Sequence, residues 1–69
     1  MKQTGELALQ CNKTAMDSLR NLNYKLAHDL LRESEQLLIS AVIGKDISEI
    51  ERVKLLALTY NNLGCLFKK

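Results

Sequence analysis

The chain has 69 residues, of which 46% are hydrophobic and 26% charged, and its formal net charge is +2. This composition excludes a disordered or collagen-like chain, and so small a net charge gives no reason to expect nucleic acid as a partner. Three glycines and no proline leave few turn signals, which disfavours an all-β fold. A chain of this length has room for one small core, so we expect one domain over residues 1–69.

A first helix is predicted over about residues 5–21. Small or apolar side chains recur there three or four positions apart, which is the period of one face of an α-helix. These positions are Ala8, Cys11, Ala15, Leu19 and Leu22. The sequence Asn21-Leu22-Asn23 interrupts the pattern, because asparagine favours turns and helix caps over helix interiors.

A second helix is predicted over about residues 24–43, with Asn23 as its N-cap and Gly44 as its terminator. Its periodic positions are Ala27, Leu30, Leu31, Ser34, Leu38, Ala41 and Val42. Most of the charged residues of this segment fall on the other faces, as expected for a helix that covers a core.

A third helix is predicted over about residues 48–68. Ser48 followed by Glu51 has the form of a capping box, and Asp46 with Glu49 offers the same signal two residues earlier. The apolar face is predicted to comprise Ile50, Val53, Leu56, Ala57, Tyr60, Leu63, Gly64 and Phe67. Short connections make neighbouring helices antiparallel. The sequence therefore predicts an all-α fold of three antiparallel helices, packed as a helical repeat or as a three-helix bundle.

Residues 11–20 and 60–69 look like copies of one another, with Ala15 and Gly64 at the matching small position. The second stretch resembles the first helix of a tetratricopeptide repeat, in which an aromatic residue, Asn-Leu-Gly and a second aromatic follow in order. Tyr60, Asn62-Leu63-Gly64 and Phe67 supply this order. Residues 21–27 resemble the turn and second-helix start of the same repeat. Leu22 stands where the family has glycine, and Ser18 stands where it has an aromatic residue.

The spacing between the two copies departs from that family. Ala15 and Gly64 are 49 residues apart, against 34 in a tetratricopeptide repeat, and the excess amounts to about four helical turns. We expect this excess to lengthen the second and third helices. Two organisations stay open, a fragment of a longer repeat array and a free-standing module.

The free-standing alternative resembles the microtubule-interacting-and-trafficking domain, a three-helix module of similar size. The segment Asn23-Tyr24-Lys25-Leu26-Ala27 suits its second helix. The family's usual third-helix ending, an Arg-Ala-Glu-like signature, is replaced here by Asn62-Leu63-Gly64.

Both resemblances imply a non-catalytic interaction module. The tetratricopeptide resemblance implies binding of a partner peptide or helix in a groove between helices, or stacking on further repeats. The alternative implies an adaptor that binds amphipathic helices. By the repeat match, the groove-facing positions are Asn12, Lys13, Met16, Asn61, Asn62 and Cys65. A clamp for a carboxylate tail is not expected, because the family's clamp has lysine where Asn12 stands and asparagine where Met16 stands.

Other kinds of site find little support in the sequence. His28 is the single histidine and has no nucleophile motif to act on, so we expect no enzyme and no small-molecule substrate. Cys11 and Cys65 are expected to be free thiols of a cytoplasmic protein, and no metal or cofactor is expected. The longest apolar run, residues 37–43, is too short to cross a membrane. Self-association stays open.

Overall fold

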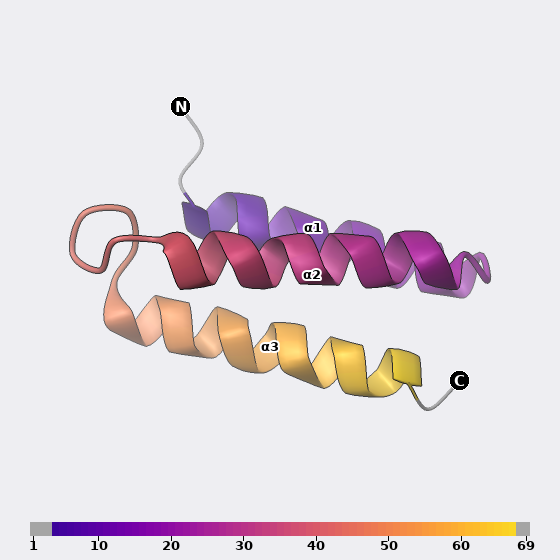
Figure 1. The fold of residues 1–69 in the computed structure, drawn as a ribbon. Coiled ribbons are helices and arrows are strands. Elements are labelled where there is room, and N and C mark those ends of the chain that lie inside the picture. The colour runs from indigo at the N-terminus through magenta and orange to yellow at the C-terminus, as the bar shows by residue number, and fades with distance from the viewer. Residues whose placement is uncertain (1–3, 68–69) are drawn as a thin grey trace.

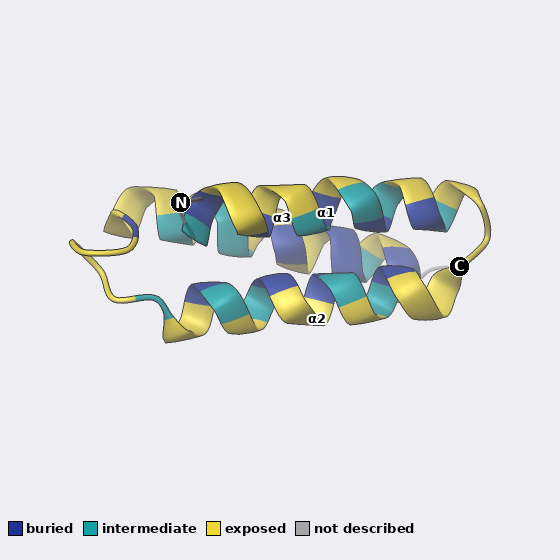
Figure 2. Cartoon of the chain, turned by 90° about the horizontal axis from the view of Figure 1, so that it is seen from above, coloured by how far each residue is buried: buried dark blue, intermediate teal, exposed yellow. Residues whose placement is uncertain are grey.

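The computed structural model describes residues 4–67, which form three α-helices. The helices are α1 (Thr4–Arg20), α2 (Tyr24–Ser40) and α3 (Glu49–Phe67). Consecutive helices run in opposite directions, and α3 lies across the gap between α1 and α2 (Figures 1 and 2). The predicted all-α fold of three packed helices is confirmed, and all three pairs of helices are in contact.

The α1–α2 pair is held together by small side chains with leucines between them. Ala8, Ala15 and Ala27 are fully buried, so the two helices approach closely at these points. Leu31 and Leu38 are the largest fully buried side chains of α2. Figure 2 shows the buried positions along the sides on which the helices face one another. The helical periodicity of the sequence located these interior positions correctly.

The turn between α1 and α2 places Leu22 in the left-handed region, with φ of 62°. The Asn23 amide donates to the Ser18 carbonyl at 2.8 Å, and the Leu22 amide donates to the Leu19 carbonyl at 3.0 Å. This pair of bonds is the Schellman motif, which ends a helix with a left-handed residue that is usually glycine. The side chain of Leu22 is 71% exposed, so its predicted place on the apolar face is wrong.

Replacing Leu22 with glycine should therefore stabilise the chain. A non-glycine residue in this conformation costs about 1–2 kcal/mol, and the greater freedom of glycine in the unfolded chain offsets part of that gain. We expect a net increase of roughly 0.5–1 kcal/mol in the free energy of unfolding, measured by urea denaturation. Leu22→Ala removes the same exposed side chain without relieving the backbone, so it should give no such increase.

α2 ends at Ser40, three residues before the predicted end at residue 43. The Ser40 hydroxyl donates back to the Gln36 carbonyl at 2.7 Å, and Ala41 is extended. Gly44 is left-handed, as expected of a terminator, but its φ of 87° serves a turn inside the following loop. The predicted lengthening of α2 is thus partly replaced by a loop over residues 41–48, which Ile47 anchors in the core beside Ala8 and Leu38.

α3 begins at Glu49, and the Ser48 hydroxyl accepts a hydrogen bond from the Glu51 amide at 3.2 Å. Ser48 is therefore the cap, and the alternative start at Asp46 is wrong. The Asp46 carboxylate instead accepts a hydrogen bond from the Val42 amide within the loop, at 2.9 Å. The predicted helix end at residue 68 lies outside the described residues.

The predicted apolar face of α3 is largely on the outside of the molecule. Of its eight positions Leu63 is buried, Leu56 and Gly64 are half-buried, and the other five are exposed, among them Ile50 at 71% and Phe67 at 72%. The buried residues of this helix are Thr59, Asn62, Leu63 and Leu66. The physical reason lies in α1 and α2, whose facing sides present the polar side chains of Asn12 and Ser34 to α3.

Candidate functional site

The interior of the molecule holds a cluster of four polar side chains contributed by all three helices. These are Asn12 from α1, Ser34 from α2, and Thr59 and Asn62 from α3, and each is at most 8% exposed. The Asn12 side-chain nitrogen donates to the Ser34 and Thr59 hydroxyls, both at 3.0 Å, and to the Ala8 carbonyl at 2.9 Å. We call these four residues the polar cluster.

Two further hydrogen bonds involve the residues that α3 contributes to the polar cluster. The Asn62 amide nitrogen donates to Asn12 Oδ1 at 2.8 Å, and the Thr59 hydroxyl donates to the Leu55 carbonyl at 2.8 Å. Within residues 4–67 every buried side-chain nitrogen and oxygen atom has a hydrogen-bond partner. Such a satisfied network fixes how three helices fit together, because a shifted or rotated helix would leave buried groups unpaired.

Two of the six predicted binding residues, Asn12 and Asn62, belong to the polar cluster. Asn12 and Asn62 bond to one another inside the molecule, where Asn12 is 2% and Asn62 8% exposed. Their position in the interior gives no support to the expected groove, and their role in binding a partner stays a prediction. Sequence reasoning also missed Ser34 and Thr59 as their partners, although polar residues that interrupt an apolar face three or four positions apart are a signal for an interior network.

The other four predicted residues lie nearer the surface. Lys13, Asn61 and Cys65 are exposed, and Met16 is half-buried against the core cluster that contains Ala15 and Leu31. Among the described residues, no hydrogen bond or ion pair joins these four to one another. Their role in binding a partner stays a prediction.

An exposed apolar surface of α3 lies outside the core that this helix forms with α1 and α2, and it borders α2 at Tyr60 and Phe67. It consists of one row of residues at helical spacing, which we call the α3 outer face. These residues are Ile50, Val53, Ala57, Tyr60, Gly64 and Phe67. Val53 is 56% exposed and Tyr60 48% exposed, and a Cβ atom built on Gly64 would meet nothing within 4 Å.

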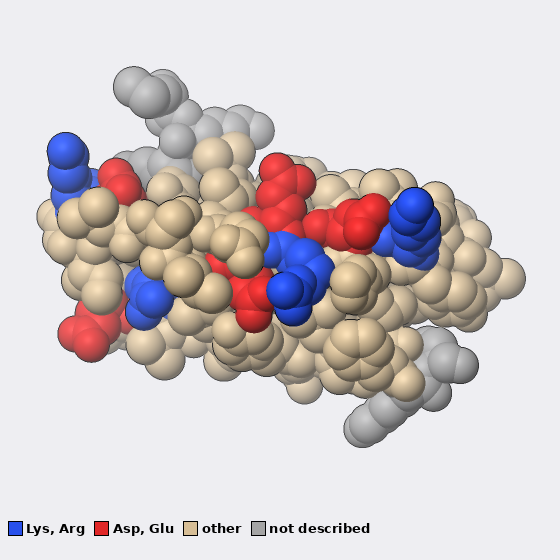
Figure 3. All heavy atoms as spheres, in the orientation of Figure 1, with Lys and Arg blue, Asp and Glu red and all other residues tan. Residues whose placement is uncertain are grey.

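Charge is absent from the part of α3 that carries Ala57, Tyr60, Gly64 and Phe67, whereas Ile50 and Val53 lie among charged residues at the start of the helix. Residues 55–67 include no Asp, Glu, Lys or Arg, although half of this stretch is exposed to solvent. Figure 3 shows charged side chains gathered over α2, while the surface below them, over α3, is uncharged for most of its length. A contiguous exposed apolar surface with polar residues at its edge is typical of a protein interaction site.

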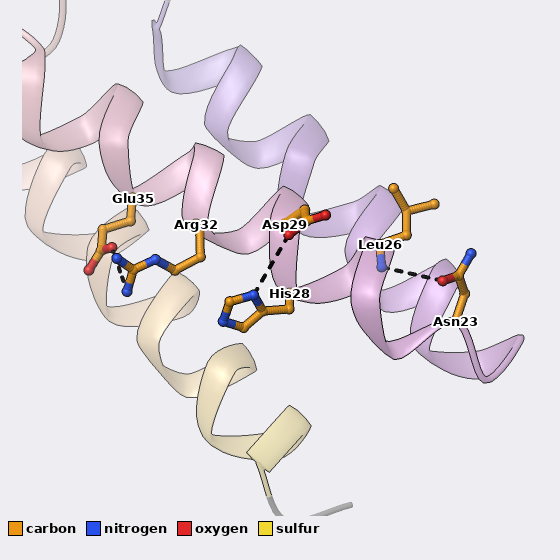
Figure 4. Close-up of polar contacts among 6 residues, drawn as sticks. All are labelled: Asn23, Leu26, His28, Asp29, Arg32 and Glu35. Carbon is orange, nitrogen blue, oxygen red and sulfur yellow. Dashed lines mark hydrogen bonds and ion pairs between the residues drawn. The ribbon is translucent and has the colours of Figure 1, made fainter.

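The polar edge of the α3 outer face is supplied by α2. Arg32 and Glu35 form an ion pair at 3.4 Å, and their side chains lie with His28 on the side of α2 that faces α3 (Figure 4). The His28 ring lies 6.1 Å from the ring of Phe67. Hydrogen bonding to the Glu35 carboxylate, together with desolvation, raises the pKa of the Tyr60 phenol above its ordinary value. The edge thus carries both signs of charge.

The two cysteines are free thiols, as predicted. Cys11 is partly covered, and this burial, followed by the charge of Glu33, raises the pKa of its thiol. A thiol with a raised pKa is less nucleophilic at neutral pH, so Cys11 does not have the properties of an activated nucleophile.

Metal and membrane sites find no support in the described part of the chain. Within residues 4–67 no three His, Cys, Asp or Glu side chains lie close enough together to hold a metal ion. None of the three helices is long and apolar enough to cross a membrane. No protein-family model, characterised protein or solved structure matches the chain. The resemblances to the tetratricopeptide repeat and to the trafficking domain therefore stay predictions.

Proposed function

We propose that the chain is a non-catalytic interaction module that binds a helical segment of a partner protein on the α3 outer face, or stacks on further helical repeats through it. The observation that carries this proposal is the exposed row of apolar residues at helical spacing on α3. Helix recognition of this kind uses apolar anchors three, four or seven positions apart, which is the spacing of Val53, Ala57, Tyr60 and Gly64.

The energetics favour an occupant on this surface. Burial of apolar surface contributes a gross hydrophobic gain of about 25 cal/mol per Å², against which the entropy lost on association is set, and Phe67 and Tyr60 have the largest side chains of the face. The absence of charge from residues 55–67 means that no ionic group loses its hydration when a helix covers the centre of the face. Arg32 and Glu35 lie at the edge, where their ion pair is already formed and the Arg32 side chain is 55% exposed.

The proposal assigns no catalytic chemistry to the chain. The polar cluster contains only amide and hydroxyl groups, which neither take up nor release a proton near neutral pH. The Ser34 hydroxyl is fully buried and already bonded within the cluster, so it supports a structural role. The two free thiols support a reducing compartment, and we propose the cytoplasm.

Selection from a display library of helical peptides on the whole chain tests this function. We expect the selected helices to bind with one-to-one stoichiometry and to shift the amide resonances of α3 outer-face residues in NMR titrations. Tyr60→Lys should weaken binding at least about tenfold by calorimetry, because it places a charge at the centre of the face. Leu26→Lys is the matched control, since Leu26 is 43% exposed but lies on α2.

The same NMR titration can also show that the α3 outer face is not the binding surface. If the shifts were confined to the surroundings of Lys13, Met16 and Asn61, the binding surface would be the one predicted from the repeat match. Equal weakening by Tyr60→Lys and Leu26→Lys would show that binding responds to charge in general and not to this face.

A second candidate is the trafficking-type adaptor that binds an amphipathic helix between two of its own helices. The observation in its favour is that all three helices meet around one satisfied polar cluster, which is what a free-standing bundle needs. Under this alternative, the resonances of Ile39 and other exposed α2 residues beyond the edge formed by Arg32 and Glu35 should shift as strongly as those on α3. Shifts limited to α3 would favour the first candidate.

A further inference from the structure

α1 presents to α2 a face built on two small residues seven positions apart. Ala8 and Ala15 are both 0% exposed, and Ala15 belongs to the same core cluster as Ala27 and Leu31 of α2. The Ala8 carbonyl accepts a hydrogen bond from the Ser34 hydroxyl at 3.3 Å. Close backbone approach at these two small positions is therefore how α1 receives an antiparallel helix.

α3 repeats this face on its outer side. The positions that lie 49 residues after Ala8 and Ala15 are Ala57 and Gly64. The same offset takes Thr4, Cys11 and Ser18 to Val53, Tyr60 and Phe67, which also belong to the α3 outer face. On α1 this row is buried at Ala8, Ala15 and Ser18, whereas on α3 the three larger side chains are exposed and the space over Gly64 is open.

We propose that the occupant of the α3 outer face is an amphipathic helix of the α2 type, antiparallel to α3. This inference rests on the proposed function and specifies its partner. The contacting face of α2 carries Ala27, Leu31, Ser34 and Leu38, which alternate small residues with leucines at spacings of four, three and four. The partner helix has the same alternation and no charge on that face, because residues 55–67 of α3 have no charge to pair with it.

The α3 outer face also sets the size of the partner's side chains. Tyr60 and Phe67 are larger than Cys11 and Ser18 at the equivalent positions of α1. The partner helix therefore needs small residues opposite these two aromatic rings, as α2 has Ala27 and Ser34 in its own interface. A helix with bulky residues at every contacting position would be held away from Ala57 and Gly64.

The test uses the whole chain extended at its C-terminus by a Gly/Ser linker of about six residues and a second copy of residues 23–41. The tether raises the effective concentration of the appended helix to the order of millimolar, which makes weak packing measurable. We expect the midpoint of thermal unfolding to rise by about 5 °C or more over a matched extension that carries Leu31→Asp and Leu38→Asp in the appended copy alone.

The appended helix could also replace the native α2 in the core. A charge placed on the α3 outer face distinguishes this exchange from packing on that face. Ala57→Lys in α3 should abolish the gain if the appended helix packs on the outer face, and it should leave the unextended chain folded because Ala57 is exposed. A gain that survives Ala57→Lys, or no gain at all, overturns the proposal. Dimerisation of the unextended chain through α3, seen by sedimentation, would overturn it in favour of a second copy as the occupant.

The sequences of the library-selected helices test the type of partner separately from the proposed binding to the α3 outer face. If library-selected helices bind the α3 outer face but lack the alternation of small residues and leucines, the proposed function stands and this inference fails. If no helix binds that face, both fail.

Discussion

Replacing Asn62 with alanine is expected to destabilise the chain by about 1–3 kcal/mol, whereas the same replacement at Asn61 should change its stability by less than about 0.5 kcal/mol. The two residues are adjacent and chemically identical, but Asn62 is 8% exposed and bonded to Asn12, and Asn61 is exposed. Asn62→Ala leaves the buried Asn12 Oδ1 without its donor. Asn61→Ala removes a poor helix former from a solvent-facing position, which favours α3 slightly.

Asn12→Ala should cost more, about 2–4 kcal/mol, because it removes the residue to which the rest of the polar cluster is bonded. For a chain of this size that is a large part of a total stability of roughly 3–10 kcal/mol. Urea unfolding followed by circular dichroism measures all three variants. Equal effects of Asn61→Ala and Asn62→Ala would contradict the interior position of Asn62.

Leu63→Ala is expected to destabilise the chain by about 2–4 kcal/mol, whereas Val53→Ala should lie within about 0.5 kcal/mol of the parent. The sequence pattern placed both residues on one apolar face, but Leu63 is 7% exposed in the core and Val53 is 56% exposed on the α3 outer face. Truncating Leu63 leaves a cavity beside Ala15, Leu31 and Leu66, whereas truncating Val53 leaves none.

The variants Leu63→Ala and Val53→Ala also distinguish an effect on the free energy of unfolding from an effect on partner binding. Val53→Ala should weaken binding of a helix to the α3 outer face while leaving the midpoint of urea unfolding unchanged. A large loss of stability in Val53→Ala would mean that α3 packs with the predicted face inward. Thermal and urea unfolding of the two variants, measured beside the parent, distinguish these arrangements.

Helix positions could be predicted well from the sequence, because they depend on local signals. Asn23 and Ser48 accept backbone hydrogen bonds at the starts of α2 and α3, as their residue types indicate. The end of α2 was less predictable, since Ala41 and Val42 continue the apolar period beyond it. The loop stops the helix earlier through a contact that is not local in the sequence, the burial of Ile47 beside Ala8 and Leu38.

The orientation of α3 could not be predicted from periodicity alone. α3 carries apolar side chains around most of its circumference, so the apolar row ending at Phe67 and the row through Thr59, Asn62 and Leu66 both have helical spacing. What selects the second row is Asn12, whose amide needs partners on a neighbouring helix when it is buried. Two rows on one helix are also what leaves one of them free as a candidate partner surface.

The orientation of α3 places Asn12 and Asn62 in the interior and leaves the α3 outer face exposed. A nuclear Overhauser spectrum of the isotope-labelled chain tests it most directly. We predict cross-peaks from the Asn12 side-chain amide protons to the side chains of Thr59 and Asn62. Cross-peaks from the Tyr60 ring protons to the methyl groups of Ala8 or Ala15 would contradict this orientation of α3, since they would place the α3 outer face in the core.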